Sequence, residues 1–228
     1  MKKTITTCAI ITLAFISCQK DIELTLSSHQ YFIDIAMRNE ILQKDINIHK
    51  WTKDVKIHFE GLKYSEFESE KQRVINDLND LIDEISIDIV NERDEANVIG
   101  VFSIYEDYKE NYEPIFCELL PNATSVRGAG NMIPIKGEIQ TATFFVNVSE
   151  ISSGRFSSIY REELTQILGL PNDTDIYPES IFYQSVDSLT YVTEYADIDK
   201  EIIKILYSDA IKPNMNRCQV KKALSRLE

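Results

Sequence analysis

Alternating apolar and polar positions mark three strands along the chain. Between residues 51 and 60, Val55, Ile57 and Phe59 alternate with polar residues. A period of two residues predicts a strand with one buried face. Two further runs are rich in aromatic and β-branched residues, which favour strands. They lie at residues 98–105 and 141–148.

Apolar residues that recur every three to four positions mark the helices. The longest such pattern covers residues 65–85, where Val74 and Leu78 share one face. Ser65 and Glu68 fit a capping box at its start. The same period predicts further helices at residues 29–43, 157–168, 199–207 and 216–227.

Strands and helices interleave without a linker-like stretch between them, which predicts one α+β domain over residues 24–228. Hydrophobic residues make up 43% of the chain and charged residues 27%, which is typical of a globular protein and excludes wholesale disorder. The formal net charge of −13 repels phosphate backbones, so no nucleic-acid partner is expected.

The N-terminus is expected to be an export signal. Residues 1–17 join Met-Lys-Lys to an apolar run that is too short to span a bilayer. The run ends in Phe-Ile-Ser before Cys18, which is similar to a bacterial lipobox, where the cysteine thiol is acylated. This pattern predicts an outer-membrane lipoprotein, held by lipid on Cys18. An ordinary cleaved signal peptide is the alternative.

Residues 18–23 would then form a polar tether between the lipid and the domain. Its start, Gln-Lys-Asp, is similar to a signal that carries lipoproteins to the cell surface in some bacteria with two membranes. A plain spacer is the alternative. The membrane, through the lipid anchor, is thus one expected partner.

Two cysteines remain after processing, Cys117 and Cys218. In an exported protein they can form one disulfide that closes a loop of about a hundred residues. Two independent thiols are the alternative, because a sequence does not measure their separation. Neither lies in a Cys-x-x-Cys motif, which argues against a zinc ribbon or a thioredoxin-like site.

The segment Arg-Gly-Ala-Gly at residues 127–130 is expected to form a turn or bulge between strands. It lacks the spacing of a phosphate-binding loop, and no Lys-Ser or Lys-Thr pair follows it. A nucleotide phosphate site is therefore excluded here.

The segment YREELTQILGLPND, residues 160–173, has the frame of a metzincin zinc helix, HExxHxxGxxH. In that frame two histidines one turn apart bind zinc, and the intervening glutamate polarises the attacking water. The glycine turns the chain so that a third ligand reaches the metal. The three histidine positions hold Glu162, Gln166 and Asn172, and the glutamate and glycine are kept as Glu163 and Gly169.

These motifs resemble an uncharacterised zincin-like family, domain of unknown function 2927. Its members carry an EELxQxLGLPND helix, a SIF turn and a C-terminal segment with LLY and KPGM. The chain has the helix motif, Ser180-Ile181-Phe182, Leu206-Tyr207 and Lys212-Pro213-Asn214-Met215. It departs from the family at Asn214, where glycine is usual, and near Tyr160, where the family often has a cysteine.

The resemblance runs from about Tyr31 to Leu224 and implies a zincin-like, metzincin-like α+β fold. That fold has a mixed sheet, a helix of the active-site type and C-terminal helices. Trp51 to Val55 is similar to the family's first strand, and Phe182 stands where metzincins have the methionine under the metal.

The residues at the ligand positions do not favour a zinc site. Glu162 can bind a metal ion, but the neutral side chains of Gln166 and Asn172 are poor ligands. No metal and no cofactor is therefore expected. A rescued zinc site needs a histidine from the N-terminal third of the chain, which holds His29, His49 and His58.

In place of a metal, Glu162, Gln166 and Asn172 are expected to form a buried hydrogen-bond network that acts as a clamp. The leading hypothesis is a binding or scaffold module, a pseudo-metallopeptidase. Its cleft beside an exposed sheet edge would hold an extended peptide or a protein of the cell envelope. The alternative is a peptidase or other hydrolase in which Glu163 is the general base beside an unusual metal.

Overall fold

The computed structural model describes residues 28–39, 44–62, 67–111, 126–149, 153–184 and 191–227. The expected signal peptide (1–17), the lipid-attachment residue Cys18 and the tether (18–23) lie outside these ranges, as does Cys117. Its expected disulfide partner, Cys218, is exposed on the surface. The predictions on export and on the disulfide therefore stay predictions.

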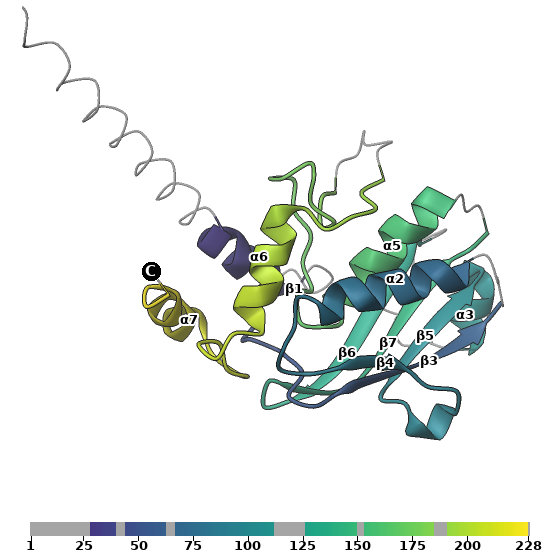
Figure 1. Ribbon diagram of the computed structural model, residues 1–228, viewed down its shortest axis with the longest axis horizontal. Helices are drawn as coiled ribbons and strands as arrows, with labels where there is room; N and C mark the ends of the chain where they lie inside the picture. Colours follow the sequence, from purple (N-terminus) through teal and green to yellow (C-terminus); the bar gives the residue numbers. More distant parts are fainter. Residues whose placement is uncertain are drawn as a thin grey trace, which may run out of the picture.

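A five-stranded mixed sheet forms the centre of the molecule (Figure 1). β3 pairs in parallel with β4 and β5, β5 pairs in parallel with β7, and β6 pairs with β7 antiparallel. The three strands expected from the sequence are confirmed as β3, β5 and β7. In spatial order the strands are β4 (Ile87–Ile89), β3 (Val55–Gly61), β5 (Val98–Ser103), β7 (Glu138–Asn147) and β6 (Gly128–Ile135).

Residues 127–130 do not form the expected turn, because Gly128 begins the edge strand β6. The hairpin between β6 and β7 turns instead at Lys136 and Gly137, which both have positive φ, 52° and 83°. Two successive residues with positive φ are typical of the two-residue hairpin turn that matches the twist of antiparallel strands. The glycines at residues 128 and 130 are explained instead by close packing against the helix that covers β6.

Two helices cover one face of the sheet, α2 (Glu68–Asn79) and α5 (Ser153–Gln166) (Figure 1). The opposite face carries α3 (Tyr105–Asn111), whose Tyr108 stacks on Phe145 of β7 with ring centroids 4.1 Å apart. The remaining elements are a helix at residues 28–36, the ribbon β1 (Arg38–Asn39) and β2 (Lys44–Asp45), the 3-10 turn η2 (Arg93–Glu95), α6 (Asp197–Leu206) and α7 (Arg217–Leu224).

Two of the expected helices are shorter than their apolar patterns. The helix expected at 29–43 ends at residue 36, because β1 follows directly. The helix expected at 65–85 is α2, which ends at Asn79, although Ile82 and Ile85 beyond it stay buried. Its N-cap residue is Phe67, without a side-chain cap, and Ser65, from which the capping box was expected, lies outside the described residues.

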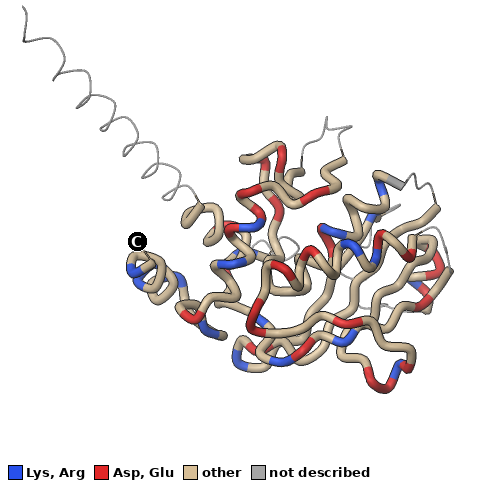
Figure 2. The backbone as a smooth tube through the Cα atoms, viewed as in Figure 1, with Lys and Arg blue, Asp and Glu red and all other residues tan. Residues whose placement is uncertain are grey.

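The apolar core lies between Tyr31 and Leu224. The chain from Gln19 onward therefore contains the whole described core and is expected to fold by itself. In the part of the chain that the structure describes, no helix is long and apolar enough to cross a membrane. Acidic positions occur along much of the chain, whereas α7 carries Lys and Arg and no acid (Figure 2).

A buried carboxyl group ties the segment after α5 to α6. Asp199, which is fully buried, accepts hydrogen bonds from the Ser180 hydroxyl (2.6 Å) and from the backbone N–H groups of Ile181 (3.1 Å) and Ala196 (3.0 Å). The Tyr31 hydroxyl donates to Ser180 in turn, at 2.7 Å. Burial raises the pKa of Asp199 from 3.8 to about 6, although these hydrogen bonds oppose the shift.

This raised pKa predicts that stability falls as the pH rises through the weakly acidic range. The folded carboxyl keeps its proton up to about pH 6, whereas the unfolded one loses it near its ordinary pKa of 3.8. Between these values the folded state binds more protons, so a rise in pH favours unfolding. Relative to Asp199→Asn, the wild type should lose about 2 kcal/mol of unfolding free energy between pH 4 and 6, measured by urea denaturation.

Carbon-13 NMR of the Asp199 carboxyl provides a check that does not depend on how the variant folds. We expect a titration midpoint near 6 in the wild type. Parallel pH profiles for wild type and variant, together with a midpoint near 4, would contradict the prediction.

Candidate functional site

The site is built around the C-terminal end of α5, which is buried. A buried helix end leaves carbonyl groups without helical partners. Here the Trp51 indole N–H donates to the Ile167 carbonyl and the Tyr207 hydroxyl donates to the Leu168 carbonyl, both at 2.9 Å. Gly169 then turns the chain with a φ of +117°. The expected helix and its glycine stop are thereby confirmed.

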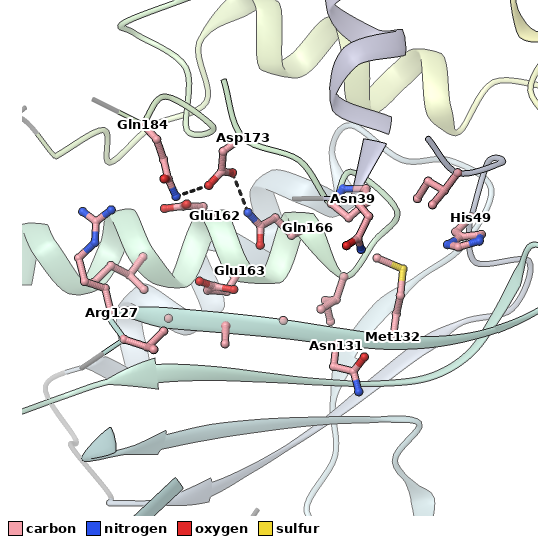
Figure 3. Close-up of a pocket in the computed structure, with 18 of the residues that line it drawn as sticks. Asn39, His49, Arg127, Asn131, Met132, Glu162, Glu163, Gln166, Asp173 and Gln184 are labelled. Atoms are coloured by element: carbon pink, nitrogen blue, oxygen red, sulfur yellow. Dashed lines mark hydrogen bonds between the residues drawn. The ribbon is translucent and has the colours of Figure 1, made fainter. Parts of the chain in front are cut away.

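A cleft of about 470 Å³ lies beside α5 and the edge strand β6 (Figure 3). Of the five positions that the zinc-helix frame singles out, three line it: Glu162, Glu163 and Gln166. The opposite wall comes from β6, and the ribbon of β1 and β2 closes one end. Further lining residues are Asn39, Lys44, His49, Arg127, Gly128, Gly130, Met132, Pro134, Asp173 and Gln184.

Glu163 points from α5 toward β6, and its side chain is buried (Figure 3). A Cβ atom on Gly128 would lie 2.3 Å from Glu163 Oε1, and one on Gly130 would lie 2.9 Å from the side chain of Ile167. Only glycine therefore lets the strand run this close beneath the helix. The Arg-Gly-Ala-Gly segment is explained by this contact.

A hydrogen-bond network is present, with members other than those expected. Asp173 is its centre: Gln166 Nε2 donates to one carboxylate oxygen at 2.8 Å, and Gln184 Nε2 donates to the other. Asn172 instead donates to the backbone carbonyls of Asp34 (3.1 Å) and Asp173 (2.9 Å) and does not line the cleft. The network expected between Glu162, Gln166 and Asn172 is corrected accordingly.

These contacts do not fit a zinc ion at the metzincin position. Gln166 and Asn172 use their amide groups on protein partners, and Asn172 faces away from the cleft. His49 does line the cleft, but at the end beyond Met132, away from Glu162 (Figure 3). Within the described ranges no group of three or more His, Cys, Asp and Glu residues could hold a metal ion.

His49 is half-buried, and burial lowers its pKa. A neutral imidazole at one end of the cleft offers a hydrogen-bond donor and an acceptor to a ligand. His29 and His58 do not line the cleft. No periodic pattern along the chain predicts that His49 lines the cleft, because its position depends on contact between its own backbone and Gly169.

The outer edge of β6 lies beside the cleft, and no other described strand pairs with it. Asn147 N–H donates to the Arg127 carbonyl at 2.8 Å, so the odd-numbered residues of β6 up to Ile133 direct their backbone groups toward β7. The N–H and C=O groups of Gly128, Gly130 and Met132 therefore point outward. Among the described residues they make no backbone hydrogen bond beyond the sheet.

The backbone of Pro134 also points outward from the sheet, but proline has no N–H group and cannot donate a hydrogen bond to a partner strand. The edge can therefore pair with a partner strand along residues 128–132 and not further. Sequence reasoning missed this edge, because the strand was taken for a turn. Two glycines at alternate positions were the available signal for a backbone approached closely on one side.

Comparisons with known proteins identify a family and no activity. The model of DUF2927, a family described as a protein of unknown function, matches residues 27–226. No curated protein matches the chain. Among solved structures, that of myroilysin matches with a TM-score of 0.42 and 12% identity, over 70% of this chain and 82% of that chain. A similarity of that size does not by itself define a shared fold.

Gly169→Ala should destabilise the protein by at least about 2 kcal/mol, measured by urea denaturation. The substitution forces an alanine into a conformation with φ +117°, and its Cβ would lie 2.1 Å from the His49 carbonyl oxygen.

Gly154→Ala in α5 is the matched control. Apart from its chain neighbours and the backbone of its own helix, no described atom lies within 4 Å of the position of its Cβ, so this variant should be unchanged or up to about 1 kcal/mol more stable. Equal losses in the two variants would show that the turn after α5 does not require glycine.

Proposed function

The chain belongs to the DUF2927 family of proteins of unknown function, and from that premise we propose that it is a non-catalytic peptide-binding module. We propose a zincin-like fold in which the metal site has been replaced by the contacts of Gln166 and Asp173. The kept Glu163 and Gly169, in the frame of a zinc helix, support this relationship.

The observation that carries the proposal is the open edge of β6 beside the cleft. An extended peptide can add to such an edge as a further strand, with its backbone paired to Gly128, Gly130 and Met132. Backbone pairing gives affinity without regard to sequence. The carboxylates of Glu162 and Asp173 and the imidazole of His49 line the cleft and would then select side chains.

The side chains at the expected metal-ligand positions support binding more than catalysis. Hydrolysis by the zincin mechanism needs a metal that polarises the peptide carbonyl and lowers the pKa of water. Here the amides of Gln166 and Asn172 stand in place of imidazoles and are engaged by protein groups. Glu163 occupies the position of the catalytic glutamate in the zinc-helix frame, and it lies buried against the glycines of β6.

The test is selection from a pool of random, N-acetylated and C-amidated hexapeptides with the chain from Gln19 onward. We expect the retained peptides to be recovered uncleaved, and in equal amounts whether zinc or a metal chelator is present. Met132→Pro should weaken a selected peptide about fivefold, because one outward donor is lost while the ladder with β7 is kept.

Met132→Leu is the control, since it changes the side chain and keeps the N–H. Its affinity should match the wild type within about twofold. Failure to retain any peptide, or equal weakening in both variants, would overturn the edge-pairing proposal. Zinc-dependent cleavage that is lost in Glu163→Gln would favour the hydrolase alternative instead.

We further propose that the domain is a lipoprotein, anchored in the outer membrane through Cys18. The support is the charged start, the short apolar run and the Phe-Ile-Ser-Cys sequence at residues 15–18. A lipid at this position would hold the peptide-binding domain outside the cytoplasm, near proteins of the cell envelope.

Expression of the full chain in a bacterium that is fed an alkyne fatty acid tests the anchor. The wild type should incorporate the label and fractionate with membranes, and Cys18→Ser should lose both properties. Cys8→Ser is the control and should behave as the wild type, because Cys8 lies in the predicted signal peptide. Unlabelled wild-type protein would contradict the proposal.

A further inference from the structure

The C-terminal end of the chain has the opposite charge to the rest of the molecule. The whole chain has a formal charge of −13, yet residues 210–227 contain five basic residues and no acid. Three of the five lie on α7 or just after its last residue. Within the described ranges these three make no ion pair. They are Lys221, Lys222 and Arg226.

These three side chains form one exposed face, called here the basic face of α7. The other side of the helix is buried through Val220 and Leu224. The remaining two cations are partly neutralised: Lys212 lies 3.4 Å from Asp209, and Arg217 lies 3.8 Å from Asp45.

Local helix energetics explain only part of this pattern. Cations in the last turn of a helix interact favourably with its dipole. Arg217 and Lys221, however, are like charges four residues apart on α7, an arrangement that destabilises a helix. An outside partner of negative charge would stabilise such a face.

The position of α7 points to the class of that partner. α7, α6 and the helix at residues 28–36 lie at one end of the molecule (Figure 1). The described chain begins there at Ser28, ten residues after Cys18. An extended segment of that length spans at most about 35 Å. A lipid on Cys18 would therefore keep α7 within reach of the bilayer surface.

We propose that the basic face of α7 docks on an anionic phospholipid surface. Headgroup phosphates attract Lys and Arg within about one Debye length, so the distant acidic residues of the chain are screened. Leu227, about half exposed and next to Arg226, adds an apolar contact at the interface. A nucleic acid fits less well, because the negative charge of the whole chain opposes wrapping.

This inference takes from the proposed function only the tether at Cys18, and the docking itself needs no covalent lipid. The experiment therefore uses the chain from Gln19 onward, which lacks the attachment cysteine. It is sedimented with vesicles of phosphatidylcholine alone or of phosphatidylcholine mixed with phosphatidylglycerol. We expect binding to the mixed vesicles only, weakening as salt is added.

Lys222→Gln combined with Arg226→Gln should reduce this binding about 25-fold, since each basic residue at an anionic surface contributes about fivefold. Lys53→Gln combined with Lys109→Gln is the matched control, because both lysines are exposed and lie on other elements. It has the same net charge and should bind as the wild type. Far-ultraviolet circular dichroism should show equal helix content in both variants.

Equal binding by the two double variants, or equal binding to both kinds of vesicle, would overturn the proposal. Full inhibition by a short DNA duplex at the concentration of the lipid phosphate would assign the basic face to nucleic acid. If fatty-acid labelling of Cys18 succeeds while vesicle binding fails, the anchor stands and the docking surface is wrong.

Discussion

The architecture depends on how the buried end of α5 is completed. A helix end inside a core must satisfy its last carbonyl groups, and this one does so with two distant side chains. Trp51 comes from before the first strand of the sheet and Tyr207 from the end of α6. Gly169 lets the chain leave the helix against the backbone of His49. These three contacts join the N-terminal, central and C-terminal segments at one point.

The geometry of the cleft follows from that anchoring. With its end fixed, α5 lies close over β6, and residues 128 and 130 must be glycine because Glu163 and Ile167 occupy the space of a side chain. The same closeness directs Glu163 toward the strand, while Glu162 and Gln166 face the segment that carries Asp173 and Gln184 (Figure 3). One helix thus presents carboxylates on two sides of a groove whose floor is an open strand edge.

Polar groups at the site hold together segments that are far apart in the chain. Gln166 and Gln184 share Asp173, and Asn172 reaches back to the helix at residues 28–36. Deeper in the core, Asp199 joins the turn at Ser180 to the start of α6. Buried polar groups such as Asn172, Ser180 and Asp199 must be matched by partners to be tolerated, so they fix the relative positions of the segments they join.

The sequence by itself determined the elements whose signals are local. The period of two defined β3, the period near 3.6 with a terminal glycine defined α5, and the zinc-helix frame identified Glu162, Glu163 and Gln166 as cleft residues. Only the tertiary structure decided that residues 128–135 are a strand, that Asp173 replaces Asn172 in the network, and that His49 enters the cleft. Each of these depends on contacts between segments far apart in the chain, and neither spacing nor composition encodes those distances.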